Sequence, residues 1–172
     1  MIKYRGIIYD NVLHAQWACF FDIVAWRHQY KPSPVPNWHP TFRVEFTCGH
    51  SECGEYHSLL VDVTTRQWKM KESPGRRYPF GHLDIKISVE DWHQEWDPEI
   101  DACASAVFGF HPGLSEWEMS HGAGGGTHSV QDWVPEWERI WSRAAAVIAE
   151  LEHAQRAMDV RFVESYAVKK GE

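Results

Sequence analysis

Four potential soft-metal ligands lie within ten residues of this 172-residue chain. They belong to the segment from Thr41 to Thr64, TFRVEFTCGHSECGEYHSLLVDVT, and comprise two cysteines and two histidines, which supply the thiolate and imidazole ligands of tetrahedral zinc sites. Their spacings are permitted in zinc fingers but are not specific to them, and two reduced cysteines with two ordinary surface histidines are the alternative. The prediction is a structural Zn²⁺ site with Cys48, His50, Cys53 and His57 as ligands.

Two strand-like runs flank these ligands. Residues from Thr41 to Thr47 and from Leu59 to Thr64 are rich in β-branched and apolar types, which predicts two strands joined as a hairpin. The Cys/His segment at 48–57 is then an insertion at the tip of that hairpin. Because no second Cys-x-x-Cys arm is present in the sequence, zinc would have to close the site locally.

Helical spacing predicts one helix before these strands and another at the end of the chain. Asn11 is a suitable N-cap for a first helix that should end near Tyr30, and Pro135 suits the first turn of a long helix at about 135–160. This C-terminal helix should pack on the sheet. The apolar positions are Leu13, Trp17, Phe20, Phe21 and Val24 in the first helix, and Trp137, Ile140, Trp141, Ala144, Val147, Ile148 and Leu151 in the last.

The remaining apolar runs predict further strands. We expect strands at 83–89 and 104–110, and an edge strand at 115–120. The glycine-rich run SHGAGGGTHS that follows should be a flexible loop. It lacks the Lys-Ser/Thr ending of a phosphate-binding loop, so it does not indicate nucleotide binding.

A basic and aromatic segment, RQWKMKESPGRRYPF, follows the second strand of the hairpin. Cations interleaved with aromatic rings can contact a phosphate backbone and stack on bases, although a solvated loop has the same composition. The net charge of −7 argues against general nucleic-acid binding, but local charge can override it. The candidate nucleic-acid-binding residues are Arg66, Trp68, Lys69, Lys71, Arg76 and Arg77.

Composition favours a single domain over residues 1–172. A hydrophobic content of 44% with ten Trp, eight Phe and six Tyr is enough to fill one core. No apolar run is long enough to cross a bilayer and no signal peptide is recognisable, so we expect a cytoplasmic protein without a membrane partner. In a reducing compartment, neighbouring cysteines and histidines indicate metal more than disulfide.

Three short motifs carry a family resemblance. LHAQWACFFD lies in the first helix, HPTF begins the strand after it, and VDVT ends the following strand. Together with the order of the elements from Tyr4 to Val130, they resemble the small phage and prophage proteins of the PD-(D/E)xK nuclease-like superfamily. The resemblance implies an α/β (α+β) restriction-endonuclease-like core, with a mixed central sheet flanked by an N-terminal helix and a long C-terminal helix.

The resemblance also implies where a catalytic site would lie. In such nucleases an acid on each of two adjacent strands holds Mg²⁺, a lysine steadies the attacking water, and a helix glutamate assists. In this chain His14 replaces the helix glutamate, Thr41 replaces the first acid and Thr64 replaces the lysine. The second acid is retained as Asp62. Only one carboxylate of the set is present, which should weaken Mg²⁺ binding greatly because this ion requires oxygen ligands.

A rearranged catalytic site is one way to retain activity. His14 and Asp62 could hold Mn²⁺ or Zn²⁺ if Glu45, which shares a strand face with Thr41, supplied a second carboxylate and Arg66 or Lys69 replaced the lysine charge. His14, Glu45 and Asp62 are therefore the candidate catalytic residues. Mg²⁺ or Mn²⁺ is a cofactor only in this case.

Three functions are consistent with these residues. The one we favour is a phage or mobile-element protein of nuclease ancestry that has lost catalysis and binds nucleic acid or a host or phage protein, in an accessory or counter-defence role. The alternatives are an active metal-dependent nuclease with a rearranged site and a zinc-stapled protein-interaction module. Of these functions, the sequence favours one without enzymatic activity.

Overall fold

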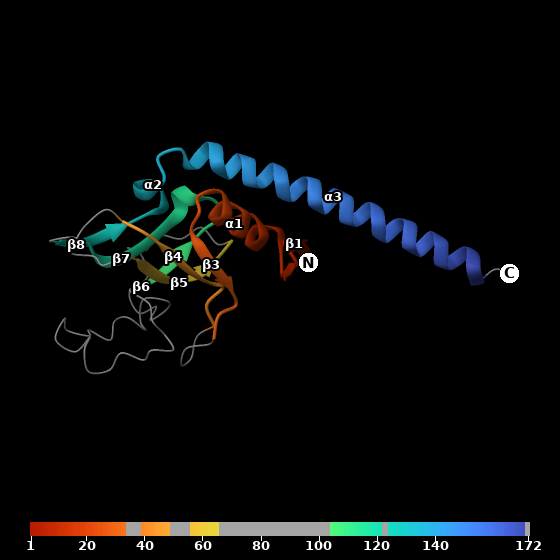
Figure 1. Ribbon diagram of the computed structural model, residues 1–172, viewed down its shortest axis with the longest axis horizontal. Coiled ribbons are helices and arrows are strands. Elements are labelled where there is room, and N and C mark those ends of the chain that lie inside the picture. Colours follow the sequence, from red (N-terminus) through yellow and green to blue (C-terminus); the bar gives the residue numbers. More distant parts are fainter. Residues whose placement is uncertain (34–38, 49–55, 66–103, 122–123, 171–172) are drawn as a thin grey trace.

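The computed structural model describes residues 1–33, 39–48, 56–65, 104–121 and 124–170, and these residues form a mixed α/β fold (Figure 1). Three predicted features lie wholly or partly outside them: the Cys/His segment over 49–55, the basic segment from Arg66 to Phe80, and the strand at 83–89. The elements are β1 (Ile2–Tyr4), β2 (Ile7–Tyr9), α1 (Val12–Ile23), β3 (Arg27–Tyr30), β4 (Phe42–Phe46), β5 (His57–Val63), β6 (Ala104–Phe108), the short 3-10 helix η5 (Pro112–Leu114), β7 (Ser115–His121), β8 (Gly124–His128), α2 (Val130–Trp133) and α3 (Trp137–Lys170).

Six of the strands form one mixed sheet in the order β3-β4-β5-β6-β7-β8. Neighbouring strands are antiparallel except β5 and β6, which are parallel. The predicted hairpin is present as β4 and β5, in which Phe42 pairs with Val61 and Val44 with Leu59. The expectation of an α/β fold with a mixed sheet is therefore confirmed.

The two faces of β4 differ because its side chains alternate. Phe42, Val44 and Phe46 are buried on the face covered by α1, whereas Arg43 and Glu45 lie on the opposite face and are half-buried. Paired residues on neighbouring strands share a face, so Ser58 and Leu60 of β5 lie on the face of Arg43 and Glu45. We call these the helix-covered face and the second face.

Trp17 of α1 occupies the centre of the core on the helix-covered face. Its ring is fully buried, with ring centroids of Phe108 at 4.7 Å and of Trp141 at 4.8 Å. Its indole N–H donates to the carbonyl oxygen of Gly109 at 2.9 Å, so the polar end of the side chain is satisfied. One residue therefore joins α1, α3 and the end of β6.

The first helix ends earlier than predicted. Asn11 is its N-cap as expected, and its Oδ1 accepts from the His14 N–H at 2.9 Å. The helix does not reach Tyr30 but ends at Ile23, and Ala25 then has a φ of 57°. Residues Arg27 to Tyr30 instead form β3, because their backbone pairs with β4. The alternation of half-buried and exposed residues along this strand is a period of two, which is a strand signal.

The glycine-rich run also differs from the prediction. Gly124–His128 forms the edge strand β8 rather than a flexible loop, and β7 is an interior strand between β6 and β8. The register pairs Trp117 with His128. A strand ladder is made of backbone hydrogen bonds, so residues without side chains can form it where a neighbouring strand supplies partners.

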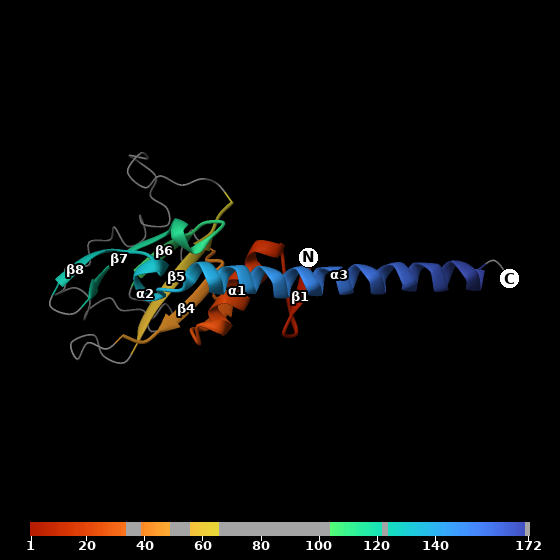
Figure 2. The same ribbon diagram turned by 90° about the horizontal axis from the view of Figure 1, so that it is seen from above.

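The C-terminal helix is longer than predicted and has a different neighbour. It comprises 34 residues from Trp137 to Lys170, beyond the predicted end near 160. It packs chiefly on α1 and on β1 of the N-terminal hairpin, so α1 separates it from most of the sheet (Figures 1 and 2). The hairpin β1-β2, whose turn has Arg5 and Gly6 at positive φ, was not predicted. No helix within the described ranges is long and apolar enough to span a membrane.

Candidate functional site

The position of Asp62, a predicted catalytic residue, is fixed by the pairing of β4 with β5. The Thr41 N–H donates to the carbonyl oxygen of Val61 at 2.8 Å, and Thr41 Oγ1 accepts from the Val63 N–H at 3.1 Å. This places the Thr41 hydroxyl directly across from Asp62, to whose Oδ1 it donates at 3.3 Å. Thr41 and Asp62 are thus juxtaposed on adjacent strands, with a neutral hydroxyl where a second carboxylate would be needed to hold a hard metal ion.

Glu45 lies on the same face of the sheet as Asp62 but far from it along the strands. Its cross-strand partner is Ser58, four residues along β5 from Asp62, which corresponds to about 13 Å at the usual rise of a strand. The Glu45 carboxylate is engaged by two arginines, with Arg27 Nη2 at 3.1 Å and Arg43 Nε at 3.3 Å. The carboxylate is held in an ion-pair cluster rather than directed at Asp62.

His14 lies on the other side of the sheet. Its Nδ1 is 3.0 Å from the Tyr30 hydroxyl, and its ring packs edge-on to Phe42 with centroids 6.3 Å apart. Both neighbours belong to the helix-covered face, whereas Glu45 and Asp62 belong to the second face. The structure therefore does not bring the three predicted catalytic residues together. Within the described part of the chain, no group of three or more His, Cys, Asp or Glu residues is arranged to hold a metal ion.

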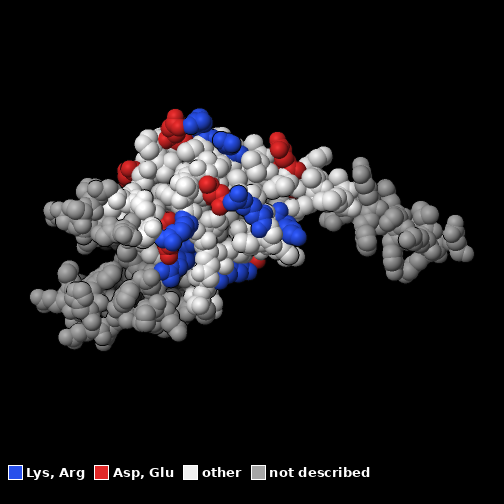
Figure 3. Space-filling view, in the orientation of Figure 1, with Lys and Arg blue, Asp and Glu red and all other residues white. Residues whose placement is uncertain are grey.

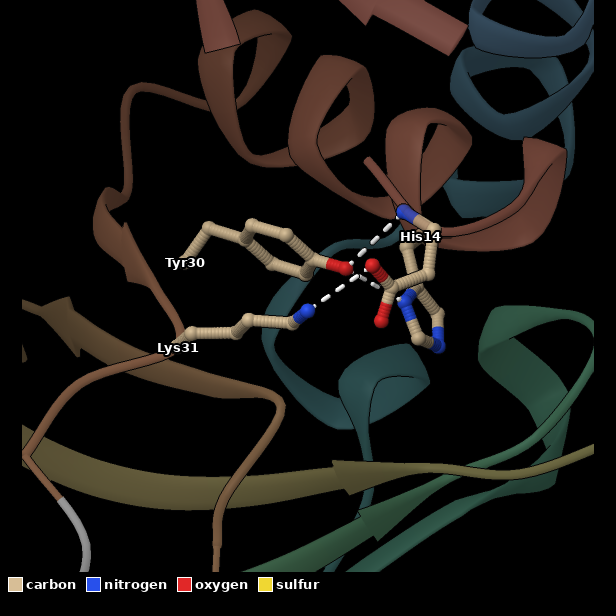
Figure 4. Close-up of polar contacts among 4 residues, drawn as sticks. His14, Tyr30 and Lys31 are labelled. Atoms are coloured by element: carbon tan, nitrogen blue, oxygen red, sulfur yellow. Dashed lines mark hydrogen bonds and ion pairs between the residues drawn. The ribbon is translucent and has the colours of Figure 1, made fainter. Parts of the chain in front are cut away.

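The surroundings of His14 instead form a polar network between α1 and the end of β3 (Figure 4). The Tyr30 hydroxyl accepts from the Asp10 N–H at 3.0 Å, which leaves its own proton available to His14 Nδ1. Lys31 Nζ pairs with the Asp10 carboxylate at 2.8 Å, and this hydrogen bond lowers the pKa of Asp10. Burial lowers the pKa of His14, which favours the neutral ring. The network ties the start of α1 to the sheet.

A hollow of about 290 Å³ opens beside the Glu45 cluster at the β3–β4 end of the sheet, lined by Arg27, His28, Gln29, Arg43 and Glu45. The Arg27 side chain is 62% exposed, and its Cζ lies 4.2 Å from the centroid of the Tyr56 ring. Tyr56 is itself 46% exposed. We call Arg27, Gln29, Arg43 and Tyr56 the β3–β4 surface. Figure 3 shows that Lys and Arg side chains recur on this side of the molecule with carboxylates close by.

Sequence reasoning missed the β3–β4 surface for an identifiable reason. The helical prediction extended to Tyr30, so Arg27 was placed on a helix instead of beside Arg43 on a paired strand. The signal that could have revealed it is the alternation of Arg43 and Glu45 with buried residues in β4. The predicted nucleic-acid-binding residues Arg66, Trp68, Lys69, Lys71, Arg76 and Arg77 lie outside the described residues.

Two of the four predicted zinc ligands can be located. Cys48 follows β4 and is half-buried, and His57 is the first residue of β5. The His57 ring is only 3% exposed and lies 5.6 Å from Phe46 and 5.7 Å from Trp133, between ring centroids. His57 is thus a buried residue of the helix-covered face, not a surface histidine. His50 and Cys53 lie outside the described residues, so the zinc site stays a prediction.

No protein-family model matches this chain, and comparisons with curated proteins and with solved structures likewise find no match.

Proposed function

We propose that this chain is a nucleic-acid-binding protein of nuclease ancestry that has lost catalysis, and that it binds through the β3–β4 surface. The observation that carries the proposal is the second face of the sheet, where Asp62 meets a threonine hydroxyl, two arginines line a hollow, and an exposed tyrosine lies against one of these arginines. A restriction-endonuclease-like core is part of the proposal. It is supported by the mixed sheet and by Thr41 and Asp62 lying opposite each other on adjacent strands. An accessory or counter-defence role in a phage or mobile element rests on the family resemblance alone.

The proposed loss of catalysis is supported by the metal ligands that the described residues offer on this face. Mg²⁺ binds through carboxylates and other oxygens, and a two-acid site supplies the charge that offsets its dehydration. Thr41 contributes a neutral oxygen beside Asp62, and Glu45 is about 13 Å away along the strand, engaged by Arg27 and Arg43. Among the residues that the structure describes, this part of the face offers one carboxylate beside a hydroxyl, which is a weak site for a hard divalent ion.

Binding is favoured by the same ion-pair cluster. The Arg27 side chain is 62% exposed, so its guanidinium group can be reached by a phosphate from solvent. Guanidinium groups bind phosphate through paired N–H donors, and an exposed tyrosine can stack on a base. Glu45 meanwhile keeps the Arg27 and Arg43 side chains near each other in the unbound protein.

The experiment is a fluorescence-polarisation titration with labelled single-stranded DNA, single-stranded RNA and duplex DNA. The test variant is Arg27→Gln/Arg43→Gln. The matched control is Arg139→Gln/Arg156→Gln, which also removes two arginines paired with glutamates, but on α3. We expect the test variant to bind at least about tenfold more weakly, since charged hydrogen bonds are worth roughly 1.5–3 kcal/mol each, and the control to bind like wild type. Equal losses in both variants, or no binding by wild type, would overturn the proposal.

A cleavage assay separates this function from the active nuclease. The same nucleic acids incubated with Mg²⁺ or Mn²⁺ should stay intact. Cleavage that disappears in an Asp62→Ala variant would contradict the loss of catalysis and support a rearranged site instead.

A further inference from the structure

The Glu45 carboxylate is a half-buried acceptor held between two cations. Its Oε2 lies 3.1 Å from Arg27 Nη2 and its Oε1 lies 3.3 Å from Arg43 Nε, so each oxygen has one arginine partner. Among the residues that the structure describes, these two arginines are its only ion-pair partners. A carboxylate offers about four lone-pair sites, two on each oxygen. One acceptor site on each oxygen is therefore left for a ligand in the hollow that Glu45 lines.

Two acceptor sites side by side suit a ligand that presents two neighbouring N–H donors. Among the nucleobases guanine alone does so, through the N1–H and the 2-amino group of its base-pairing edge. Adenine and cytosine place a ring-nitrogen acceptor beside their single amino group, and thymine and uracil flank their one N–H with two carbonyl oxygens. Those acceptors would face the Glu45 oxygens and repel them. The carboxylate therefore favours guanine over the other bases.

The other groups around the hollow complement the remainder of a guanine nucleotide. Gln29 and Arg43 are paired across β3 and β4 and line the hollow, where their N–H groups are donors for the guanine O6. Tyr56 lies against Arg27 and is 46% exposed, so its ring is a surface on which a base can stack. The hollow of about 290 Å³ is at the small end of ligand sites, which suits one base.

The pairs with Glu45 also leave the two arginines able to contact phosphate. Each guanidinium group carries five N–H donors, and each uses one of them for Glu45. Reading of a base by Glu45 and contact of the arginines with the strand backbone are therefore compatible in one complex.

We propose that the hollow beside Glu45 binds one unpaired guanine of a nucleic-acid strand, with the carboxylate accepting from N1–H and the 2-amino group. This inference rests on the proposed function and names the ligand of the same surface. In a duplex the base-pairing edge of guanine is occupied by cytosine, so the hollow selects single strands.

The test is a fluorescence-polarisation titration with a short labelled oligothymidine in which one central base is replaced. Wild type should bind the guanine oligonucleotide about 5- to 150-fold more tightly than the adenine one, the range for a bidentate base contact. Hypoxanthine lacks the 2-amino group and should lose most of this gain, whereas 7-deazaguanine keeps the base-pairing edge and should retain it. Equal affinities for guanine and adenine would overturn the proposal, and so would a preference that hypoxanthine retains or that 7-deazaguanine abolishes.

A variant of the carboxylate provides a second readout. Glu45→Gln has the same shape but one acceptor oxygen, so it should bind the guanine and adenine oligonucleotides equally. Its affinity for plain oligothymidine should be at least that of wild type, because a negative charge near the strand is removed. Glu152→Gln is the matched control, since Glu152 is also paired with an arginine but lies on α3, and it should keep the guanine preference. Far-UV circular dichroism verifies that both variants are folded.

The outcomes separate this inference from the proposed function. A guanine preference that persists in Glu45→Gln would overturn the inference. Oligothymidine binding that depends on Arg27 and Arg43 but shows no guanine preference would overturn the inference alone. A wild-type protein that binds none of the oligonucleotides would overturn the proposed function and this inference with it.

Discussion

Replacing Thr41 with aspartate would place a second carboxylate across from Asp62. The Thr41 hydroxyl already lies 3.3 Å from Asp62 Oδ1, so two carboxylates at these positions would be separated by about 4 Å. Two like charges at 4 Å repel each other by about 4 kcal/mol at an effective dielectric constant of 20. Both residues are half-buried, and solvent reduces this figure. We therefore expect Thr41→Asp to lower the free energy of unfolding by about 2 kcal/mol in the presence of a chelator.

The same change should make the protein responsive to metal. A divalent cation can bridge the two carboxylates, and a ligand at a hundred times its Kd adds about 2.7 kcal/mol to the free energy of unfolding. Urea unfolding followed by tryptophan fluorescence, with EDTA and with increasing Mn²⁺, measures both effects. Thr41→Asn is the control, since it supplies an amide of similar size without the charge. If Thr41→Asp were as stable as Thr41→Asn in EDTA and indifferent to Mn²⁺, the juxtaposition of Thr41 and Asp62 would be refuted.

Two further predictions concern the fold. A Cβ at Gly109 would lie 2.7 Å from the Leu114 Cβ, so Gly109→Ala should lower the free energy of unfolding by about 1–3 kcal/mol. The control is Gly126→Ala, which should cost much less because no atom lies within 4 Å of a Cβ at that position. Equal urea midpoints for the two variants would contradict this packing. Burial lowers the pKa values of His14 and His28 from 6.5, so the unfolded chain binds more protons below that pH. The contribution of these two histidines to the free energy of unfolding should therefore be fully present above about pH 6.5 and be lost as the pH falls toward the lowered pKa values. Unfolding midpoints that stay constant across this range would contradict the burial of the two rings.

Local signals were sufficient to predict several elements of the fold. Asn11 caps α1 as its side-chain type indicated, and the β-branched runs on either side of the Cys/His segment pair as β4 and β5. These features depend on residues close together in the sequence. The end of α1 and the strand β8 depend instead on strand pairing that their own residue types do not signal, since Arg27–Tyr30 and Gly124–His128 are strands because β4 and β7 lie beside them.

The candidate site shows the same division. Strand alternation correctly placed Glu45 on the face of Thr41, but it could not show that Glu45 lies opposite Ser58 rather than near Asp62, because that requires the cross-strand register. His14 was a plausible partner for Asp62 in sequence. The packing of α1 on the helix-covered face puts the sheet between them, and a helical periodicity cannot reveal which face of a sheet the helix will cover.

The salt dependence of single-stranded oligonucleotide binding tests the proposed function most directly. Each phosphate contact contributes about 0.7 to the slope of log affinity against log salt concentration for single strands. If Arg27 and Arg43 each contact a phosphate, Arg27→Gln/Arg43→Gln should have a slope shallower than wild type by about 1.4, while Arg139→Gln/Arg156→Gln should retain the wild-type slope. Equal slopes for wild type and the β3–β4 variant would contradict the account, because the arginines of this surface would then contact no phosphate.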